Sequence, residues 1–428
     1  MSVACGCSSN QPIEQGFGPD PRLPPPDESA IPVVHVPVAT GWPSGARPQA
    51  APGLTLTQFA GGLEHPRWVY VLPNGDVLVA ESNRPVPSKE IDSKGLEGRA
   101  MKYLMKRAGA GVPSADRITL LRDADGDGVA ETRSTFLAEL TSPFGMALVG
   151  DTFYVANADA LVRIPYQTGA QSLQSRPVKI APLPAGRNHH WTKSLVASKD
   201  GRKLYVGVGS NSNIADHGMA EEENRAAILE IDAATGATRV FASGLRNPVG
   251  MAWEPQTGAL WAAVNERDEL GNDLVPDYMT SVKDGGFYGW PWSYYGQNVD
   301  ERVEPANPAM VAKAIKPDYA LGAHTGSLGL AWSGGNTLGA QYAQGMFIGQ
   351  HGSWNRRPAS GYKVIFVPFR NGQPQGGPQD VLTGFLSDDG KAQGRPVGVA
   401  IDARGGLLVA DDVGNVIWRI SAAGGAQK

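Results

Sequence analysis

A sixfold repeat constrains this chain more than any other feature of its sequence. Each copy has a small or polar turn, an apolar strand, a tight glycine-containing turn and a second apolar strand. The copies begin near His65, Ser142, His190, Asn247, Gly326 and Arg395. One copy alone cannot bury both faces of its strands, whereas radial stacking of several such sheets can, and it leaves few free edges. The repeat therefore predicts an all-β fold, a six-bladed β-propeller.

Glycine content and proline distribution agree with this organisation. The chain of 428 residues contains 54 glycines, which indicates many tight turns. Residues 1–53 are rich in proline ("PDPRLPPPDESAIPVV") and lack periodicity, so we expect an extended tether or strap there. Residues 54–428 are expected to form the propeller. Apolar residues near helical spacing at Lys94–Ala108 predict a surface helix inserted after the first blade.

Charge, hydropathy and cysteine content exclude several classes of protein. The formal net charge of -4 gives no basic footprint for nucleic acid. No window has the roughly 18 consecutive apolar residues of a membrane span. The two cysteines, Cys5 and Cys7, precede the propeller, which excludes a disulfide framework or cysteine metal site within it. The segment "VACGCSSNQP" is similar to a lipoprotein cleavage site without its upstream half, and a disordered start is the alternative.

Candidate functional residues lie just before the first strand of each copy, because equivalent positions of successive blades converge on the propeller axis. Arg246 and Asn247 enter the fourth copy where His190 enters the third, so His190 and Arg246 should lie near each other. A histidine can act as a base near neutral pH, and an arginine can hold a carboxylate or polarise a carbonyl oxygen. His189 and His190 should point in opposite directions, so at most one faces the axis. Either could instead be a packed or surface residue.

Two acidic segments are candidates for calcium binding. The segment "DADGDG" has Asp123, Asp125 and Asp127 in alternation before a glycine, which resembles the start of a calcium loop. The glutamate usual at the twelfth position is absent, and Glu131 could replace it. Residues 265–296 form a long segment dense in carboxylates and aromatics, which suits a hard cation or is a solvated acidic loop.

Histidines and arginines of the fifth and sixth copies are expected on the same rim. The segment "GQHGSWNRRP" combines cationic and aromatic side chains, which suit a flat anionic ligand. The predicted contacts to such a ligand in these copies are His324, His351, Arg356, Arg357 and Arg395.

Several of these segments together resemble the sorbosone dehydrogenase branch of the soluble quinoprotein glucose dehydrogenase family. The resemblance rests on "GLRNPVGMAW", "NERDELGNDLVPDY", "GGFYGWP", "NHHW" and "GLLVADDVGNVIWRI", and it runs from about Leu54 to Ile420. It implies a dehydrogenase that oxidises a sugar or aldehyde with pyrroloquinoline quinone (PQQ), a planar tricarboxylate, held by calcium over the propeller axis. In such an enzyme the cofactor supplies the oxidising chemistry and the protein orients and polarises.

The resemblance also implies roles for individual residues. His190 would take the proton of the substrate hydroxyl while a hydride passes to the quinone, and His189 is its close rival. Arg246 would polarise the quinone oxygen, with Asn247 beside it as a cofactor contact. The family's calcium is held partly by backbone carbonyls, in a loop that maps to the neighbourhood of Asp268 and Glu269 here.

The sequence departs from the family pattern at three cofactor contacts. The family's lysine in the fifth blade has no clear match, since His351 and the arginines that follow it stand there instead. Of the paired arginines in the last blade only Arg395 is evident, and the glutamine of the second blade is replaced within "SPFGMA". A different grip on the cofactor carboxylates is therefore expected.

Two other functions fit a six-bladed propeller. One is a calcium-dependent sugar lactonase, which would surround an axial metal with carboxylates and asparagine; His190 with Arg246 suits an anionic cofactor better. The other is a propeller that binds a glycan or protein without catalysis. For the dehydrogenase, the chain has no CxxCH haem motif, so an external acceptor such as a cytochrome c or a quinone is expected. The resemblance implies a periplasmic or secreted location, with lipid anchoring as an option.

Overall fold

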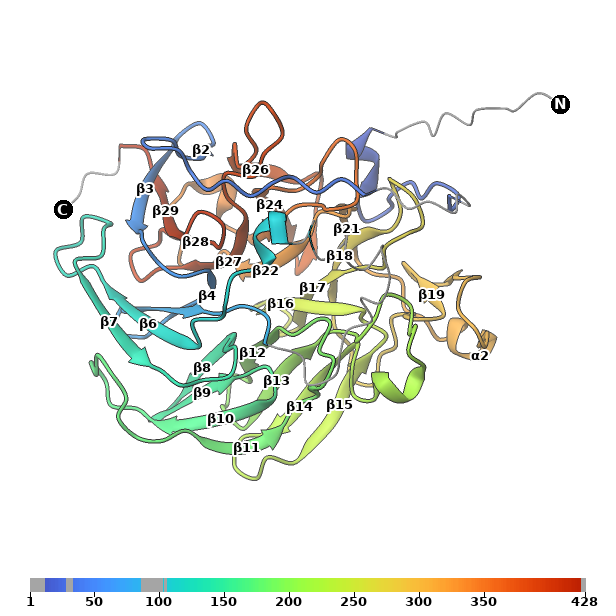
Figure 1. The fold of residues 1–428 in the computed structure, drawn as a ribbon, viewed down its shortest axis with the longest axis horizontal. Helices are drawn as coiled ribbons and strands as arrows, with labels where there is room; N and C mark the ends of the chain where they lie inside the picture. The colour runs from blue at the N-terminus through green and yellow to red at the C-terminus, as the bar shows by residue number, and fades with distance from the viewer. Residues whose placement is uncertain (1–11, 28–33, 86–102, 104–105, 425–428) are drawn as a thin grey trace.

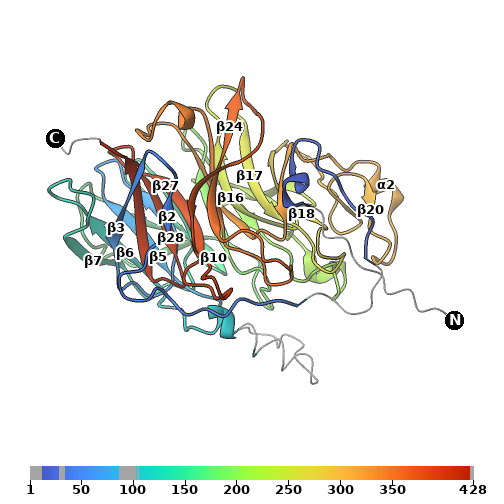
Figure 2. The same ribbon diagram turned by 90° about the horizontal axis from the view of Figure 1, so that it is seen from above.

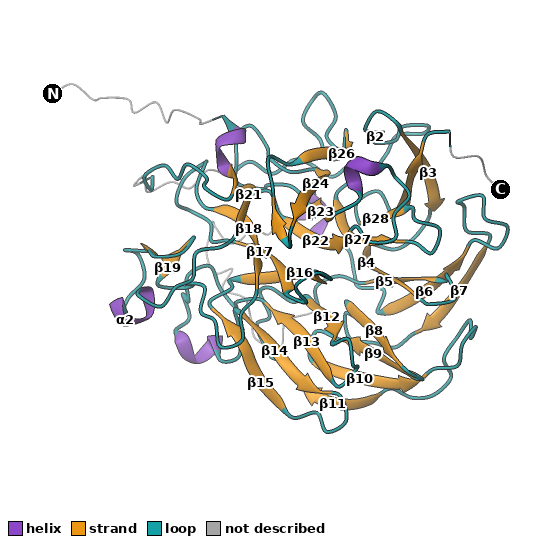
Figure 3. Ribbon diagram, turned by 180° about the vertical axis from the view of Figure 1, so that it is seen from behind, coloured by secondary structure: helices purple, strands orange, loops and turns teal. Residues whose placement is uncertain are grey.

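Six antiparallel sheets surround a central axis in the computed structural model, which describes residues 12–27, 34–85, 103 and 106–424. The innermost strand of each sheet lies near the centre of Figure 1, and the outer strands lie toward the periphery. This arrangement confirms the predicted six-bladed β-propeller. Strands dominate throughout and helices are few and short (Figure 3). Most of the helix predicted over Lys94–Ala108 lies outside the described residues.

The blades follow one another in chain order, and within each blade the strands run in order from the axis outward. Blades one and two contain β4 (Pro66–Val71), β5 (Val77–Glu81), β6 (Arg117–Arg122) and β7 (Thr132–Leu137), then β8 (Gly145–Val149), β9 (Thr152–Ala156), β10 (Ala160–Pro165) and β11 (Val178–Pro182). Blades three and four contain β12 (Lys193–Ala197), β13 (Lys203–Val208), β14 (Ala227–Asp232) and β15 (Thr238–Ser243), then β16 (Asn247–Trp253), β17 (Leu260–Asn265), β18 (Pro276–Ser281) and β21 (Tyr319–Ala323). Blades five and six contain β22 (Ser327–Trp332), β23 (Gly345–Gln350), β24 (Lys363–Arg370) and β26 (Gln379–Thr383), then β27 (Pro396–Ile401), β28 (Leu407–Asp411), β29 (Val416–Ala422) and β3 (Leu54–Ala60).

The remaining elements are short and lie on edges or in loops. The strands are β1 (Phe17–Gly18), β2 (Gln49–Ala50), β19 (Ser293–Tyr294), β20 (Asn298–Val299) and β25 (Gln373–Pro374). The helical turns are η1 (Ile13–Gly16), η2 (Lys106–Ala110), η3 (Met219–Glu222), α2 (Pro308–Val311) and η4 (Ala340–Tyr342). None of the helices among the described residues has the length and apolar character needed to cross a membrane.

Close approach of neighbouring inner strands explains a glycine that recurs in the repeat. In the patterns "NPVGMA" and "RPVGVA" this glycine is Gly250 or Gly398. A Cβ atom on Gly250 would lie 2.5 Å from the backbone nitrogen of Leu330 in the next blade, and one on Gly398 would lie 2.9 Å from the carbonyl oxygen of Arg67. Only a residue without a side chain permits that contact. The inner strands therefore pack backbone to backbone around the axis.

Apolar side chains fill the space between successive blades. The second strands are buried on both faces, as in the fully buried run "VLVAE" of β5, whereas an outer strand such as β15 exposes several residues. Continuous apolar runs are typical of strands covered on both sides. Six clusters of buried apolar residues lie between or within the blades. This packing fixes the ends of the inner strands relative to one another.

The N-terminal segment and strand β3 contact the rest of the propeller at several places. Strand β3 pairs with β29 and completes the last blade, so the first and last strands of the propeller close the ring. Strand β1 pairs with β21, and β2 pairs with β26. Figure 2 shows the segment before β2 running along one face of the propeller. The indole of Trp42 in this segment donates a hydrogen bond of 2.7 Å to Asp411 at the end of β28.

Candidate active site on the axial rim

One rim of the propeller collects polar side chains from all six blades. Each inner strand is antiparallel to its neighbour, so the start of the inner strand and the end of the second strand lie on the same side of the blade. Residues that precede β12, β16 and β27 therefore meet residues that follow β13, β17 and β28. This is the rim on which the sequence predicted the functional residues.

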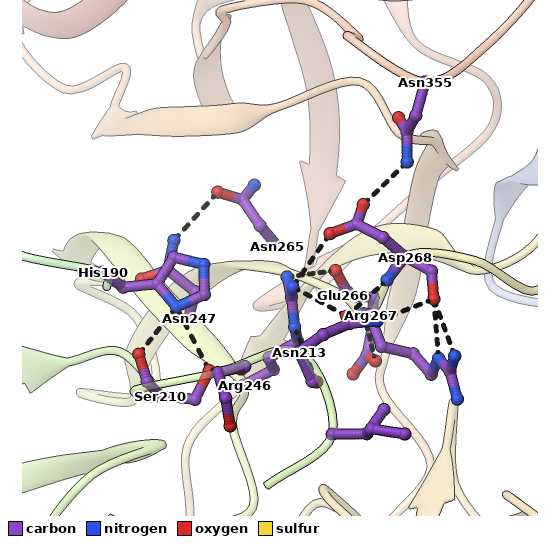
Figure 4. A network of polar contacts seen from close by, with 12 residues as sticks. His190, Ser210, Asn213, Arg246, Asn247, Asn265, Glu266, Arg267, Asp268 and Asn355 are labelled. Atoms are coloured by element: carbon purple, nitrogen blue, oxygen red, sulfur yellow. Dashed lines mark hydrogen bonds and ion pairs between the residues drawn. The ribbon is translucent and has the colours of Figure 1, made fainter. Parts of the chain in front are cut away.

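His190 presents one unbonded ring nitrogen on this rim. Its Nδ1 lies 2.8 Å from the carbonyl oxygen of Ser210 and 3.1 Å from the Ser210 hydroxyl (Figure 4). A carbonyl oxygen only accepts, so Nδ1 carries the hydrogen and Nε2 keeps its lone pair. Within the described residues Nε2 has no hydrogen-bond partner. Burial, reinforced by the charge of Arg246, lowers the pKa of His190 well below its usual value, so the ring is a neutral proton acceptor.

His189, the rival candidate, has more of its surface exposed than His190, although protein atoms surround its ring. Desolvation by the surrounding protein and the nearby cations Arg84 and Arg246 lower the pKa of His189 to about 4. The rings of His189 and His190 meet edge to face with centroids 4.8 Å apart. The two histidines therefore lie together, but only His190 has a ring nitrogen fixed by Ser210.

Arg246 lies beside His190, as the equivalence of the blades predicts. The backbone amide of Ser210 donates to the carbonyl oxygen of Arg246 at 2.7 Å, which ties the histidine's partner to the arginine. The Arg246 guanidinium is buried and donates at 2.9 Å to both Asp268 and the side-chain oxygen of Asn213 (Figure 4). Its ion pair with Asp268 holds the guanidinium in one orientation.

Asp268 binds a histidine and an asparagine of the fifth blade as well as the arginine. Asn355 donates to Asp268 Oδ1 at 2.9 Å, and His324 Nδ1 lies 3.6 Å from the same oxygen. Burial alone would raise the pKa of Asp268, but Arg246 and His324 hold it well below its usual range. Burial alone would lower the pKa of His324, but Asp268 raises it. We call Asp268 with Arg246, Asn213, His324 and Asn355 the Asp268 cluster.

Two further residues lie beneath this cluster. Asn247 donates from Nδ2 to Asn265 at 3.3 Å, and its buried Oδ1 has no partner among the described residues. Glu266 is fully buried between Asn265 and Arg267, and burial raises the pKa of its carboxyl group to about 7. The sequence predicted Asn247 at this place and did not single out Glu266.

A second buried carboxylate, Asp412, lies on the same rim in the sixth blade. One of its oxygens, Oδ2, accepts hydrogen bonds from Arg67 and, at 2.9 Å, from His351 Nε2, and His65 Nε2 lies 3.6 Å away. Burial lowers the pKa of His351 to about 4 despite the charge of Asp412, so His351 is neutral. The other oxygen, Oδ1, is buried without a partner within the described part of the chain. We call Asp412 with Arg67, His65 and His351 the Asp412 cluster.

Arg395, predicted from its place before β27, is buried next to the Asp412 cluster. Its guanidinium donates to the Tyr362 hydroxyl at 2.9 Å and lies over that ring, 5.1 Å from the centroid. The Nε atoms of Arg395 and Arg67 are both buried, and neither has a hydrogen-bond partner in the described ranges. This part of the rim therefore has guanidinium N–H groups that donate to no acceptor in the described part of the chain.

Arg356 and Arg357, predicted as cofactor contacts, also contact the neighbouring loop, and the buried Nε of Arg356 has no hydrogen-bond partner in the described ranges. Arg356 forms an ion pair of 2.7 Å with Asp273, and the backbone amide of the exposed Arg357 donates to Asn272 at 2.7 Å. The Arg356 guanidinium also donates to the carbonyl oxygen of Pro358 at 2.7 Å. These contacts brace the loop that follows Asp268.

The two predicted calcium segments differ in geometry. The carbonyl oxygen of Asp268 accepts from Arg267 at 2.8 Å, and that of Glu269 accepts from Arg302, so calcium on these carbonyls would have to displace arginine donors. The other segment is an exposed loop between β6 and β7. One carboxylate oxygen from each of its four acidic residues lies within 4.8 Å of the others, and these residues are Asp123, Asp125, Asp127 and Glu131.

Several site residues were missed by the sequence analysis. Arg67 was detectable, because it stands two residues after His65 at the entry of the first blade. Asp412 also follows a second strand directly, as Glu266 does. Asn213 and Asn355 lie in irregular loops, and no pattern in one sequence signals that they bond Asp268.

Comparisons with known proteins agree with this fold. The chain is 27% identical over 297 residues to a protein of Borreliella burgdorferi, across 67% of this chain and 77% of that protein. It is 22% identical over 363 residues to a pyrroloquinoline quinone-dependent pyranose dehydrogenase of Coprinopsis cinerea. That alignment covers 74% of this chain but only 44% of the fungal enzyme, so the chain spans less than half the length of that relative.

Structural similarity extends over most of the propeller. The structure titled as the holo form of the pyranose dehydrogenase PQQ domain from Coprinopsis cinerea superposes with a TM-score of 0.69 at 21% identity. The superposition covers 91% of this chain and all (100%) of that domain. The TrAA12-like family model matches residues 48–282 and 298–423. Since this match includes most of the chain and all six blades, the protein belongs to the TrAA12-like family.

Proposed function

We propose that this protein is a PQQ-dependent dehydrogenase that oxidises a sugar or a related aldehyde, with His190 as the base. The observation that carries the proposal is the state of His190 on the rim. Its Nδ1 is held by Ser210 and its Nε2 is unbonded within the described chain, beside a buried arginine. A neutral imidazole fixed in one tautomer is suited to take a proton from a hydroxyl group.

The donors on the rim fit a planar anionic cofactor. Arg67 and Arg395 are buried guanidinium groups, each with an unbonded Nε among the described residues. Arg246 completes a set of three buried arginines around the axis. Guanidinium groups bind carboxylates through paired donors, and a tricarboxylate would satisfy the unbonded atoms. His351 is neutral and half-buried, and it lies in the fifth-blade segment where the family's lysine has no clear match.

Each residue of this chain then has a defined task. His190 accepts the substrate hydroxyl proton at Nε2, and the Nδ1 bond to Ser210 holds the ring while it does so. Arg246 directs a positive charge toward the rim, and its ion pair with Asp268 fixes the guanidinium in advance. Arg67 and Arg395 would bind the cofactor carboxylates. PQQ, when bound, would supply the two-electron oxidising chemistry.

The electron acceptor and the cellular location belong to the same proposal. Electrons would leave the propeller to an acceptor such as a cytochrome c or a quinone. The family resemblance favours a periplasmic or secreted enzyme. The related pyranose dehydrogenase of Coprinopsis cinerea supports a sugar substrate, and a sorbosone-like aldehyde stays a prediction.

Reconstitution tests the proposal directly. The purified chain is mixed with PQQ, with and without calcium, and offered aldoses, sorbosone and simple aldehydes with an electron-accepting dye. We expect tight PQQ binding, measured by fluorescence quenching, and dye reduction that requires PQQ. The exposed Arg202, paired with Asp200 in the third blade, provides a control variant, Arg202→Ala, with unchanged activity.

The outcomes separate the candidate functions. Absence of PQQ binding together with calcium-dependent hydrolysis of a sugar lactone would replace the dehydrogenase by a lactonase. Absence of both activities, with binding of a glycan or protein, would leave a non-catalytic propeller. PQQ binding without oxidation of any offered sugar or aldehyde would contradict the substrate class.

A further inference from the structure

Two cations are buried beneath the segment that carries His190. Lys193 is fully buried and Arg225 is 6% exposed. Within the described chain neither forms an ion pair with a carboxylate; Asp159 acts on Lys193, and Glu222 on Arg225, only through its charge. An unpaired ammonium or guanidinium is costly to bury. Burial, reinforced by mutual repulsion with Arg225, lowers the pKa of Lys193 well below its usual value.

The place of Lys193 in the repeat makes its identity unexpected. Lys193 is the first residue of β12, the position that Gly145 has in β8. A Cβ on Gly145 would lie 2.3 Å from the backbone nitrogen of Leu195 in the next blade, so that position excludes any side chain. The third blade accommodates a long amine at the same point. Packing alone does not explain an amine where an apolar side chain or glycine would avoid the burial cost.

The hydrogen bonds of Lys193 lie on both sides of His190 in the sequence. Its Nζ donates to the side-chain oxygen of Asn188 at 3.0 Å and to the carbonyl oxygen of Trp191 at 3.2 Å. Asn188 has a backbone φ of 51° and donates through Nδ2 to the Ala158 carbonyl at 3.1 Å. One amine therefore fastens the residues that flank the two histidines.

Arg225 links that segment to the residue next to Ser210. It donates to the Ala185 carbonyl at 2.8 Å and to Asn188 Oδ1 at 3.3 Å, on the histidine side. It also donates to the carbonyl oxygen of Gly209 at 3.3 Å. The next residue, Ser210, supplies the oxygen that holds His190 Nδ1. The cation thus joins the two chain segments whose spacing sets the ring orientation.

We propose that Lys193 and Arg225 are positioning residues that hold His190 in the tautomer and orientation needed for proton transfer. The inference rests on the role proposed above for His190. Lys193 and Arg225 act on His190 indirectly, through their hydrogen bonds to Asn188, Trp191 and Gly209. Displacement of a reacting group by about 1 Å costs on the order of 10²-fold in rate, so modest loosening of this segment is measurable.

The test uses the full chain with ¹⁵N-labelled histidine. The ring signals of His190 are identified by their loss in His190→Gln. In the unmodified protein we expect the Nδ1–H tautomer and a depressed pKa of His190. Burial, Arg246 and His189 lower that pKa, and they outweigh the Ser210 hydrogen bond and the charge of Asp268, which raise it. In Lys193→Met we expect a mixture of tautomers and a pKa that moves toward 6.5. The control is Lys203→Met, which removes a surface lysine of the same blade that pairs with Asp232.

Kinetics provide the second readout. In Lys193→Met we expect kcat to fall about 10- to 100-fold with little change in KM, because substrate contacts are intact. If Lys193→Met does not fold, Arg225→Lys provides the same test. It keeps a cation but loses the simultaneous bonds to Ala185 and Gly209, so we expect the same changes in the tautomer and pKa of His190 and in kcat. Unchanged tautomer and pKa of His190 in both variants would overturn the inference. The tautomer change without any oxidation of sugars would keep the positioning role and reject the dehydrogenase.

Discussion

Asp268 is partly buried and Asp412 is buried, and both carboxylates lie on one rim, each bonded to an arginine and near a histidine. They differ in how many of their oxygens are bonded. Asp268 uses both oxygens, one for Arg246 and one for Asn355. Asp412 concentrates Arg67 and His351 on one oxygen and leaves the other without a partner in the described residues. Protein groups bond both oxygens of Asp268, which suits a rigid support, whereas Asp412 Oδ1, unbonded in the described chain, retains capacity for a further partner.

The histidines of the two clusters respond to these surroundings in opposite ways. The anionic Asp268 dominates around His324 and raises its pKa. Around His351, burial and the charges of Arg395 and Arg67 outweigh Asp412 and lower the pKa to about 4. The same residue pair therefore gives a protonatable histidine in one place and a neutral one in the other. Around His324 the raising contributions of Asp268, the Gly271 carbonyl and Asp277 outweigh burial, whereas around His351 burial prevails over Asp412.

The largest expected effect is on kcat, and it distinguishes His190, the proposed base, from the Asp412 cluster, the proposed ligand-binding part of the rim. His190→Ala should lower kcat by about 10²- to 10⁴-fold, because proton transfer to a positioned base is lost. PQQ binding should persist, as measured by fluorescence titration. His351→Ala should instead weaken PQQ binding and change kcat less. An equal loss of kcat in both variants would mean that the Asp412 cluster contains the base.

Removal of an arginine should affect stability in one cluster and binding in the other. Arg246→Ala leaves the partly buried charge of Asp268 without its arginine, and we expect a loss of at most about 3 kcal/mol in the free energy of unfolding. Arg395→Ala strands no carboxylate, so its stability loss should be smaller while PQQ affinity falls. Urea unfolding of the chain without PQQ, beside a PQQ titration, gives both quantities. A larger stability loss in Arg395→Ala, together with a larger loss of PQQ affinity in Arg246→Ala, would contradict the distinction between the clusters.

The pH dependence of stability should differ between His324 and His351. The raised pKa of His324 contributes stability that is present below its unfolded pKa near 6.5 and is lost as pH rises through the folded pKa. The lowered pKa of His351 has the opposite sign, with stability lost as pH falls from about 6.5 toward 4. His324→Gln should flatten the first slope and His351→Gln the second. Unfolding followed from pH 4 to 8 measures both, and identical profiles would contradict the assigned environments.

The smallest effect is expected far from the rim, in the loop between β6 and β7. Asp125→Asn with Asp127→Asn should abolish calcium binding to this loop, measured by calorimetry. If calcium binding contributes about 1 kcal/mol, calcium should raise the Tm of the unmodified chain by about 1 °C, and the variant should lose this rise. Turnover should be unchanged, because the loop is an edge connection. A loss of PQQ-dependent activity in this variant would place the functional calcium here.

The sequence predicted the features that depend on repetition. The six blades, and the proximity of His190 to Arg246, follow from a sequence pattern that recurs in each blade. The positions of Arg356 and Arg357 could not be obtained that way, because an ion pair with Asp273 turns Arg356 toward a neighbouring loop. Loop residues such as Asn213 depend on how two irregular segments fold against each other. Local spacing nevertheless grouped the carboxylates of the "DADGDG" loop, since they lie within one short turn.

The ring closure between β3 and β29 has a consequence for the synthesis of the chain. Leu54 pairs with Ala422, so the first propeller strand to be made waits for the last. At roughly 5–20 residues per second this delay is about 20–70 s, during which β3 has no permanent partner. A strand edge left open for that time can pair with another nascent chain. Chains truncated before β29 should therefore be prone to association, whereas complete chains sequester that edge as their last step of folding.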